Sequence, residues 1–240
     1  MYNLEHSHKP EAIAARLSRG PKASYIRDWV YGGIDGAITT FAIVAGALGA
    51  ELTSRYILIL GIANLLADGL SMASANYFST RSEIEEYEHV RRMEERHIDA
   101  APEGEREEVR QIFAAKGFEG HDLERAVSVI TAERERWIAT MMAEEHGLPT
   151  VNRSAITSAT ATFVSFCLCG AVPLIPFVFN LPGASTLAAV MTGAVFFAIG
   201  SIRSRWSPKS WWRAGLETFL IGVAAASVAY IVGDMLHKVL

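Results

Sequence analysis

The chain has 240 residues, of which half are hydrophobic and a fifth are charged, and its mean hydropathy is +0.20. It is too apolar for an ordinary soluble domain and too charged for a simple bundle of membrane helices, so neither class fits the whole chain. The charge is segregated, because residues 80–150 hold 18 of the 26 acidic residues against ten Arg and Lys. The sequence therefore predicts one acidic, solvated segment within an otherwise apolar protein.

Residues 1–28 form a polar arm that mixes basic and acidic side chains. The arm holds no apolar stretch of the kind found in signal peptides, so we expect no cleavable signal peptide. The rest of the chain alternates between long apolar stretches and short polar connections, apart from the acidic segment.

Five apolar stretches are long enough to cross a hydrocarbon core about 30 Å thick, which takes about 20 helical residues. They are rich in small residues, and the steps Gly32/Gly36 and Gly215/Gly222 favour close packing between helices. The sequence thus predicts an all-α, polytopic membrane protein with five transmembrane helices. These stretches lie near residues 29–50, 55–79, 154–178, 184–202 and 212–236.

The acidic segment is expected to form a three-helix, metal-binding insert between the second and third spans. No proline interrupts residues 53–101, so the second span should continue as one helix to about residue 100. Pro102 can open the next helix, and Gly147 and Pro149 can end the last one. The predicted helices of the insert are this extension, residues 103–116 and residues 121–146. The resulting domain organisation is an arm at 1–28, two spans at 29–79, the insert at 80–152 and three spans at 153–240.

The distribution of Lys and Arg predicts the orientation in the membrane. Basic residues gather in the arm, at both ends of the insert and in the loop between the last two spans, at residues 203–213. The opposite side carries only Arg55 and Lys238. We therefore expect the N-terminus and the insert to be cytoplasmic and the C-terminus to be outside.

Two of the apolar stretches carry polar side chains where hydrocarbon is expected. Asn64, Asp68 and Met72 are spaced by four residues and share one helix face, while Asp35 stands among glycines in the first span. A carboxylate in hydrocarbon costs a few kcal/mol, so these acids should face a partner helix, a cavity or a cation. Alternatively, both acids are protonated or make contacts between helices. We expect the glycines to leave room for a ligand beside Asp35.

Met72 indicates which type of metal ion a site in the spans would prefer. A thioether next to a carboxylate and an amide oxygen suits Fe²⁺ or another borderline transition ion better than Mg²⁺ or Ca²⁺, which prefer oxygen ligands. A methionine on a membrane helix is also typical of simple packing, and its spacing alone does not separate the two interpretations.

The insert offers a second set of possible ligands. Carboxylate pairs and Glu-x-x-His motifs on helices are typical of carboxylate-bridged metal sites. Glu-rich helices with interspersed Arg are equally typical of solvated faces with ion pairs one turn apart. The histidines outside the motif are interpreted as incidental. The candidate ligand pairs are Glu83/Glu86, Glu85/Glu88, Glu105/Glu108, Glu94/His97, and Glu145 one turn after Met141 and Met142.

Several segments, taken in order, resemble the vacuolar iron transporter family, which includes nodulin-like transporters and prokaryotic relatives. The resemblance covers roughly residues 25–236, with the same five spans and the same insert. The segments that carry it are DGAITTFAIVAGALGA, ANLLADGLSMASANYFSTRSEIEEY, WIATMMAEEHGL, AVPLIPF and RAGLETFLIGVAAASVAYIVGDML.

The resemblance implies a homodimeric antiporter rather than an enzyme. It would move Fe²⁺, and often Mn²⁺, out of the cytoplasm in exchange for protons. It has no permanent cofactor and no nucleic-acid partner; its partners are divalent metal ions, protons and the lipid bilayer. Asp35 and Met72 would be the membrane ligands, and the metal would also be a regulatory ligand of the insert. The insert positions that match the family's metal-binding residues are Glu94, Glu105, Glu108, Met141, Met142 and Glu145.

Two residues depart from the family pattern. His97 stands where a glutamate is common, and histidine is still a competent metal ligand. Asn64 also replaces a glutamate, which removes one negative charge and one proton acceptor from the expected transport pathway of Asp35, Asn64, Asp68 and Met72. Asp68, one turn along, could supply the missing acid.

Two other classes of protein remain compatible with the residues. A membrane-anchored, ferritin-like di-iron protein is supported by Glu94-x-x-His97, although a four-helix di-iron site needs two such motifs and two further glutamates. The second class is a metal sensor or scaffold protein whose insert binds a partner. The ligand types do not rank Fe²⁺ against Mn²⁺. The lack of organelle-targeting features favours a prokaryotic inner membrane over a vacuole.

Overall fold

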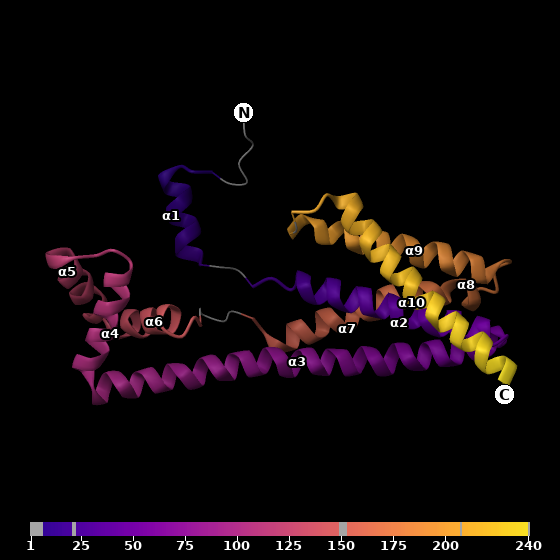
Figure 1. Cartoon of the computed structure of the whole chain (residues 1–240), viewed down its shortest axis with the longest axis horizontal. Coiled ribbons are helices and arrows are strands. Elements are labelled where there is room, and N and C mark those ends of the chain that lie inside the picture. Colours follow the sequence, from indigo (N-terminus) through magenta and orange to yellow (C-terminus); the bar gives the residue numbers. More distant parts are fainter. Residues whose placement is uncertain (1–6, 21–22, 149–152, 207, 240) are drawn as a thin grey trace. The chain divides into compact units, whose positions relative to one another are not determined.

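The computed structural model describes residues 7–20, 23–148, 153–206 and 208–239. Within these ranges the regular structure is entirely helical, which confirms the predicted all-α class (Figure 1). The helices are α1 (Pro10–Arg19), α2 (Ile26–Gly49), α3 (Ser54–Ala100), α4 (Pro102–Ala115), α5 (Gly120–Thr131), α6 (Arg134–Glu144), α7 (Ala155–Ala171), η1 (Val172–Leu174), α8 (Ile175–Val178), α9 (Ala184–Arg203), η2 (Ser204–Trp206) and α10 (Trp211–Val239).

Five of the described helical segments are long and apolar enough to cross a membrane, as the sequence predicts. The third of them is interrupted by a 3₁₀ turn at Val172–Leu174. Pro173 and Pro176 lack the backbone N–H that a continuous α-helix needs, which accounts for the interruption. The five segments are Ile26–Gly49, the apolar part of Ser54–Ala100, Ala155–Val178, Ala184–Trp206 and Trp211–Val239.

The chain divides into two compact units. The membrane unit consists of residues 24–78 and 154–240 and contains the apolar segments. The insert unit consists of residues 1–23 and 79–153 and contains the acidic segment. Helix α3 contributes its first half to the membrane unit and its second half to the insert unit.

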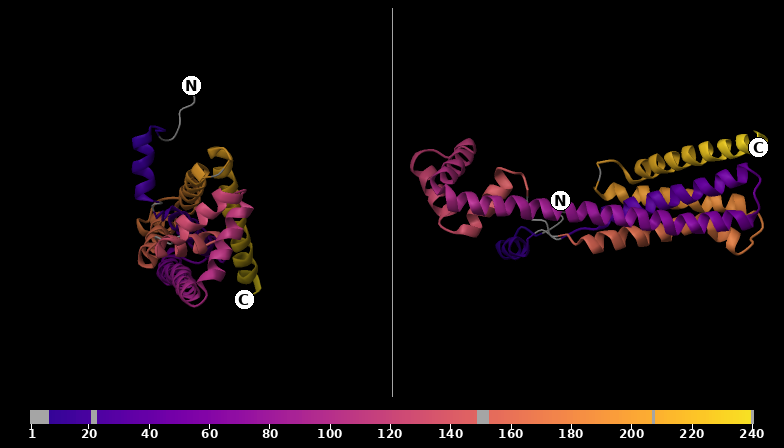
Figure 2. Two further views of the ribbon diagram at one scale, coloured as in Figure 1. Left: turned by 90° about the vertical axis from the view of Figure 1, so that its left-hand side faces the viewer. Right: turned by 90° about the horizontal axis from the view of Figure 1, so that it is seen from below.

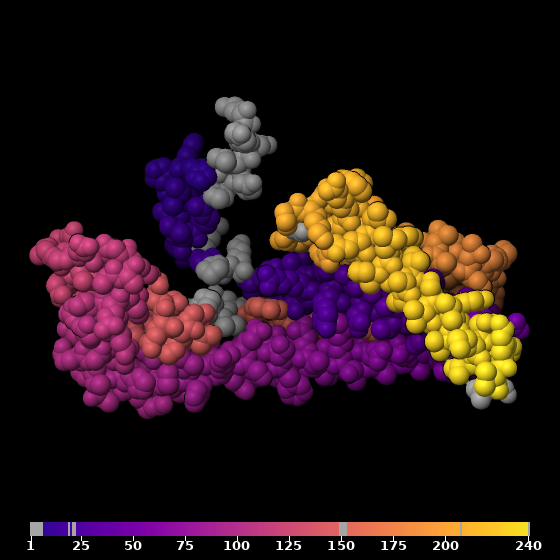
Figure 3. All heavy atoms as spheres, in the orientation of Figure 1, coloured from indigo at the N-terminus to yellow at the C-terminus, as the bar shows by residue number. Residues whose placement is uncertain are grey.

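In the membrane unit, α2 packs against α7, α9 and α10, and these helices run alongside one another (Figure 2). Glycine makes the close approach possible: a Cβ on Gly36 would lie 2.3 Å from the carbonyl oxygen of Phe166, and one on Gly222 would lie 2.1 Å from the Phe196 ring. These contacts confirm the expected role of the small residues in helix packing. Helix α10 forms an outer face of this unit and is largely uncovered (Figure 3).

Replacing Gly36 by Ala is expected to lower the midpoint of thermal unfolding in detergent. The new methyl group would collide with backbone of α7, which cannot rotate away, and such overpacking costs about 1–3 kcal/mol. Gly46→Ala on the same helix is the matched control, because its Cβ would lie 3.4 Å from the nearest atom, the Ala229 carbonyl oxygen. Helical circular dichroism followed against temperature makes the measurement, and equal midpoints for the two variants would contradict the packing argument.

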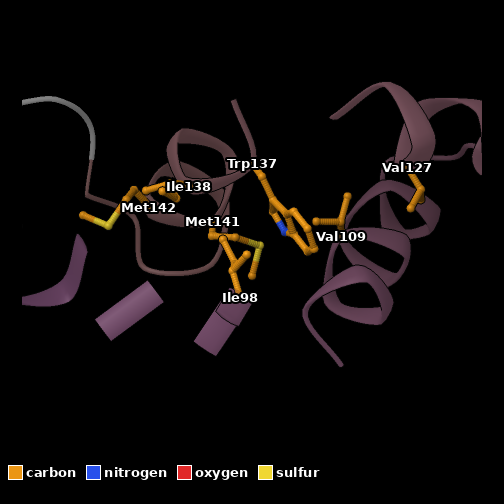
Figure 4. Close-up of a cluster of buried hydrophobic side chains, with 7 residues drawn as sticks. All are labelled: Ile98, Val109, Val127, Trp137, Ile138, Met141 and Met142. Carbon is orange, nitrogen blue, oxygen red and sulfur yellow. The ribbon is translucent and has the colours of Figure 1, made fainter. Parts of the chain in front are cut away.

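The insert unit is built around a small apolar core. Side chains from α3, α4, α5 and α6 converge there, with Trp137 pointing toward Val109 and Met141 beside Ile98 (Figure 4). The residues of this core are Ile98, Val109, Val127, Trp137, Ile138, Met141 and Met142.

The predicted helix over residues 121–146 is wrong in one respect, because the structure divides it into α5 and α6. The break falls at Ala132 and Glu133, and Glu133 has extended backbone angles (φ −126°, ψ 121°). The turn there lets Val127 of α5 and Trp137 of α6 both reach the core. The insert therefore contains the α3 extension and three further helices, rather than three helices in all.

Candidate functional site

The structure brings together five side chains of the types that bind metal, from separate parts of the insert unit: Glu94, His97, Glu105, Glu145 and His146. Glu94 lies on the α3 extension, and Glu105 lies in the first turn of α4, where a helix N-terminus favours a carboxylate. Glu145 and His146 follow the last turn of α6. Gly147, with φ of 66°, turns the chain there. The N–H groups of His146 and Leu148 donate back to the carbonyl oxygens of Met141 and Met142.

These side chains form two overlapping groups of possible ligands. One contains Glu94, His97 and Glu105, and the other contains Glu94, Glu145 and His146; within each group the ligand atoms lie within 4.8 Å of one another. His97 Nδ1 is 3.9 Å from Glu94 Oε1 and 3.5 Å from Glu105 Oε1. His146 Nε2 is 2.9 Å from Glu94 Oε1 and 3.6 Å from Glu145 Oε2. Glu94 is thus common to both groups.

The carboxylates at the centre are buried and incompletely satisfied. Glu94 is 1% exposed and Glu105 is 5% exposed, and the Oε2 atom of each has no hydrogen-bond partner. Leaving such groups in a protein interior is costly unless a cation or a proton neutralises them. Burial and the negative charges of Glu108, Glu94 and Glu145 raise the pKa of Glu105 from 4.5 to about 7. Burial and the charge of Glu108 also raise the pKa of Glu145.

Replacing Glu105 by Gln is expected to raise the melting temperature of the metal-free protein at pH 8 and to change it little at pH 5. A carboxyl whose pKa is raised on folding, here from 4.5 to about 7, destabilises the fold increasingly as the pH rises through that interval. The comparison uses thermal unfolding in detergent with a chelator present. Glu103→Gln, at an exposed position of the same helix, is the control. An effect of equal size at both pH values would contradict the assignment.

The other predicted insert residues lie at varied distances from these groups. Glu108 is exposed but close enough to raise the pKa values of both Glu105 and Glu145. Met141 and Met142 are buried in the apolar core, where they serve as packing residues whatever their role toward metal.

His146, which the sequence analysis interpreted as incidental, lies against Glu94. The weak signal for it was its place directly after Glu145 at a glycine-terminated helix end.

Solvated ion pairs account for many of the remaining insert carboxylates. Arg91 bonds both Glu95 and Glu135, and Arg110 bonds Glu124. Glu83, Glu85, Glu86 and Glu88 lie on α3 at exposed positions, and Glu85 pairs with Arg81 at 2.6 Å. The acidic helices therefore carry ion pairs on their outer faces, while Glu94, Glu105 and Glu145 converge on the inner side.

In the membrane unit, the polar stripe of α3 faces inward. Asn64, Asp68 and Met72 are all half-buried, and the Nδ2 atom of Asn64 is buried without a hydrogen-bond partner. Asp35 of α2 is also half-buried, and it lies near enough to Asp68 for the two acids to interact electrostatically. The structure thus brings one predicted acid from each of the first two spans into the same region.

Asn76 continues the stripe by one further turn and ties three helices together. Its Nδ2 atom donates to Asp28 Oδ1 of α2 at 2.9 Å and to Thr162 Oγ1 of α7 at 2.6 Å. Because Asn76 is fixed from two sides, the face of α3 that carries Met72 is held toward the interior of the unit.

The glycines around Asp35 do not leave the room for a ligand that the sequence analysis predicted. Cβ atoms on Gly32 and Gly36 would collide with backbone of α7, at 2.4 Å from Thr162 O and 2.3 Å from Phe166 O. The space that these two glycines leave is therefore occupied by α7, and it is not open to a ligand beside Asp35. The hydroxyl of Thr39 donates to the backbone oxygen of Asp35 at 2.9 Å. This hydrogen bond therefore does not involve the Asp35 carboxylate.

Fold and site together define a multi-pass, all-helical membrane protein with possible metal ligands in its spans and in a hydrophilic insert. A family model described as "VIT family" matches residues 26–234, and the chain belongs to this family.

Curated relatives agree with this assignment. A protein named vacuolar iron transporter from Toxoplasma gondii is 31% identical over 233 residues, which are 90% of this chain and 76% of the relative. One of the same name from Centaurea cyanus is 34% identical over 213 residues, 85% of each chain. Vacuolar iron transporter 1 from Arabidopsis thaliana is 29% identical over 215 residues, 88% of this chain and 86% of the relative.

Proposed function

We propose that this protein is a transporter that moves Fe²⁺, and also Mn²⁺, out of the cytoplasm in exchange for protons. The observation that carries the proposal is the occurrence, in one chain of this family, of an inward-facing polar stripe in the spans and a buried ligand group in the insert. The names of the curated relatives support iron as the cargo.

The proposed membrane pathway consists of Asp35, Asn64, Asp68 and Met72. Asp35 and Met72 bind the dehydrated ion, and the side-chain oxygen of Asn64 is a further ligand. A thioether among oxygen ligands favours a borderline ion such as Fe²⁺ over Mg²⁺ or Ca²⁺. A metal ion and a proton compete for the same carboxylates, so protonation of Asp35 or Asp68 weakens the hold on the metal. This competition couples metal movement in one direction to proton movement in the other.

The insert unit is proposed to collect divalent ions from the cytoplasm and to regulate their entry into the pathway. Its two unpartnered buried carboxylate oxygens, on Glu94 and Glu105, are neutralised when a cation binds between them and their neighbours. The acidic surface around them attracts cations before they are bound. The proposed ligands are Glu94, His97, Glu105, Glu108 and Glu145, with Met141 and Met142 as additional ones.

The proposed topology follows the basic residues of the loops. The arm (1–28) and the insert (80–152) face the cytoplasm, five crossings place the C-terminus outside, and the membrane is a prokaryotic inner membrane. Two copies form the working transporter.

A transporter is favoured over a membrane-anchored di-iron protein for two reasons. The curated relatives are named transporters. A four-helix di-iron site needs Glu-x-x-His motifs on two different helices, whereas the two in the described insert, Glu86/His89 and Glu94/His97, both lie on α3, and the exposed Glu86 and His89 belong to neither ligand group. Oxygen uptake by the detergent-purified protein on addition of Fe²⁺ separates the two, because a transporter is expected to consume none above the rate of free Fe²⁺.

Purified protein in liposomes tests the proposed function. With a fluorescent metal indicator and a pH indicator enclosed, Fe²⁺ influx is expected to follow an imposed pH gradient and to move protons the opposite way. Mn²⁺ in parallel tests the second cargo. Fe²⁺ flux that ignores the gradient, or that moves no protons, would sink the exchange mechanism.

A further inference from the structure

His146 lies against the most buried acid of the insert unit and is held there by the way that α6 ends. Its Nε2 atom is 2.9 Å from Glu94 Oε1, although the two residues are 52 positions apart in the chain. The N–H of His146 donates to the carbonyl oxygen of Met141 at 3.3 Å, and Gly147 turns the chain immediately afterwards. The ring is therefore positioned by backbone hydrogen bonds at the end of α6.

The distances around His146 are compatible with metal coordination as well as with a hydrogen bond to Glu94. Two ligand atoms at bonds of about 2.1 Å to one metal ion lie about 3.0 Å apart at right angles and about 3.4 Å apart in a tetrahedron. His146 Nε2 lies 2.9 Å from Glu94 Oε1 and 3.6 Å from Glu145 Oε2. One ion can thus contact all three atoms after small side-chain rotations.

An independent observation points to a cation at this position. Glu94 is almost fully buried, its Oε1 atom contacts His146, and its Oε2 atom has no hydrogen-bond partner. A histidine with a proton on Nε2 satisfies only the first of these oxygens. A metal ion bound by Glu94 Oε1 and His146 neutralises the charge of the buried carboxylate, which a neutral histidine cannot do.

We propose that His146 is a metal ligand of the insert unit and that it forms, with Glu94 and Glu145, a site for a borderline divalent transition ion. The inference rests on the proposed metal binding by the insert unit. It adds a nitrogen ligand on the α6 side of Glu94, where the sequence interpretation counted only carboxylates and methionines. Imidazole suits Fe²⁺, Co²⁺ and Zn²⁺, whereas Mn²⁺ is bound mainly by oxygen ligands, so His146 biases the site toward the former.

The test measures Co²⁺ and Mn²⁺ binding by titration calorimetry on the full-length, detergent-purified protein, wild type and His146→Gln. Glutamine keeps a side-chain N–H that can bond Glu94 but lacks the imidazole. If His146 is a ligand, the variant should lose about tenfold in Co²⁺ affinity and much less in Mn²⁺ affinity. X-ray absorption at the cobalt edge should show one imidazole fewer. If His146 merely positions Glu94, the cobalt spectrum of the variant will keep the wild-type number of imidazole ligands, whatever the change in affinity, and the proposal is overturned.

Two controls locate the effect. His121→Gln changes an exposed histidine of the same unit and should leave Co²⁺ binding unchanged. Glu94→Gln should remove the Co²⁺ binding that gives the imidazole signal of the insert; an unchanged affinity and an unchanged cobalt spectrum in this variant would overturn both this inference and the metal-binding role of the insert. Co²⁺ binding that needs Glu94 but tolerates His146→Gln would overturn this inference alone and leave the proposed transport function standing.

Discussion

Liposomes that carry the Asp35→Asn variant are expected to show no more Fe²⁺ flux than protein-free liposomes. Asparagine has nearly the same size as aspartate, so the packing of α2 should survive. The substitution removes a negative charge in a region of low dielectric, where the attraction of a carboxylate for a divalent ion is much stronger than in water. It also removes a group that can carry a proton. Loss of either property is enough to stop the proposed exchange.

Asp234→Asn is the matched control for this experiment. Asp234 is also a carboxylate on a long apolar helix, but it is paired with Lys238 at 2.6 Å. Its loss should leave flux close to the wild-type rate. Full-rate, pH-coupled flux in Asp35→Asn would remove Asp35 from the pathway. Flux that persists but no longer responds to the pH gradient would retain Asp35 as the proton carrier and exclude it as a necessary metal ligand.

The membrane spans could be predicted from the sequence because the property that defines them is local. A helix that crosses a bilayer needs about 20 apolar residues whatever surrounds it. The unbroken course of α3 to Ala100 was equally accessible, since no proline separates its apolar half from its acidic half. Helical spacing places Asn64, Asp68 and Met72 on one face, and the cost of a carboxylate in hydrocarbon predicts that this face turns away from lipid.

Features set by tertiary packing were not accessible in the same way. No glycine or proline marks the break between α5 and α6, and the turn at Glu133 is explained only by the core that Val127 and Trp137 share. Glycines near Asp35 are compatible with ligand access and with close helix packing. The position of α7 against Gly32 and Gly36 shows that they serve helix packing.

His146 shows the same limit at the site. Its place after Glu145 is only a weak signal, because helical spacing does not predict where a side chain beyond the end of a helix points. It joins Glu94 only because α6 ends beside α3 and the chain turns at Gly147. Conversely, the resemblance implies that Met141 and Met142 are metal ligands, and the structure shows that both are packed in the apolar core of the insert unit.

Replacing Glu94 by Gln is expected to reduce the Co²⁺ affinity of the insert by about 100-fold or more while leaving the metal-free fold intact. Glu94 is the one acid common to both ligand groups, so its neutralisation weakens each of them. The change exceeds the 10- to 100-fold effects typical of residues that only support a ligand, because a charged ligand itself is lost. Glutamine keeps an oxygen that can accept from His146, so the contact that now satisfies Glu94 Oε1 can persist.

Thermal unfolding with and without Co²⁺ measures this effect without any transport assay. Metal at about 100 times its dissociation constant stabilises the wild-type protein by about 2.7 kcal/mol, and this gain should fall to about 0.4 kcal/mol or less in Glu94→Gln. Glu95→Gln is the control, because Glu95 is the neighbouring acid and pairs with Arg91 at 3.1 Å on the outer face. Stabilisation by Co²⁺ that is equal in all three proteins would place the bound ion outside the insert. A selective loss in Glu94→Gln would instead separate the inner carboxylates, which bind metal, from the outer ones, which bind arginine.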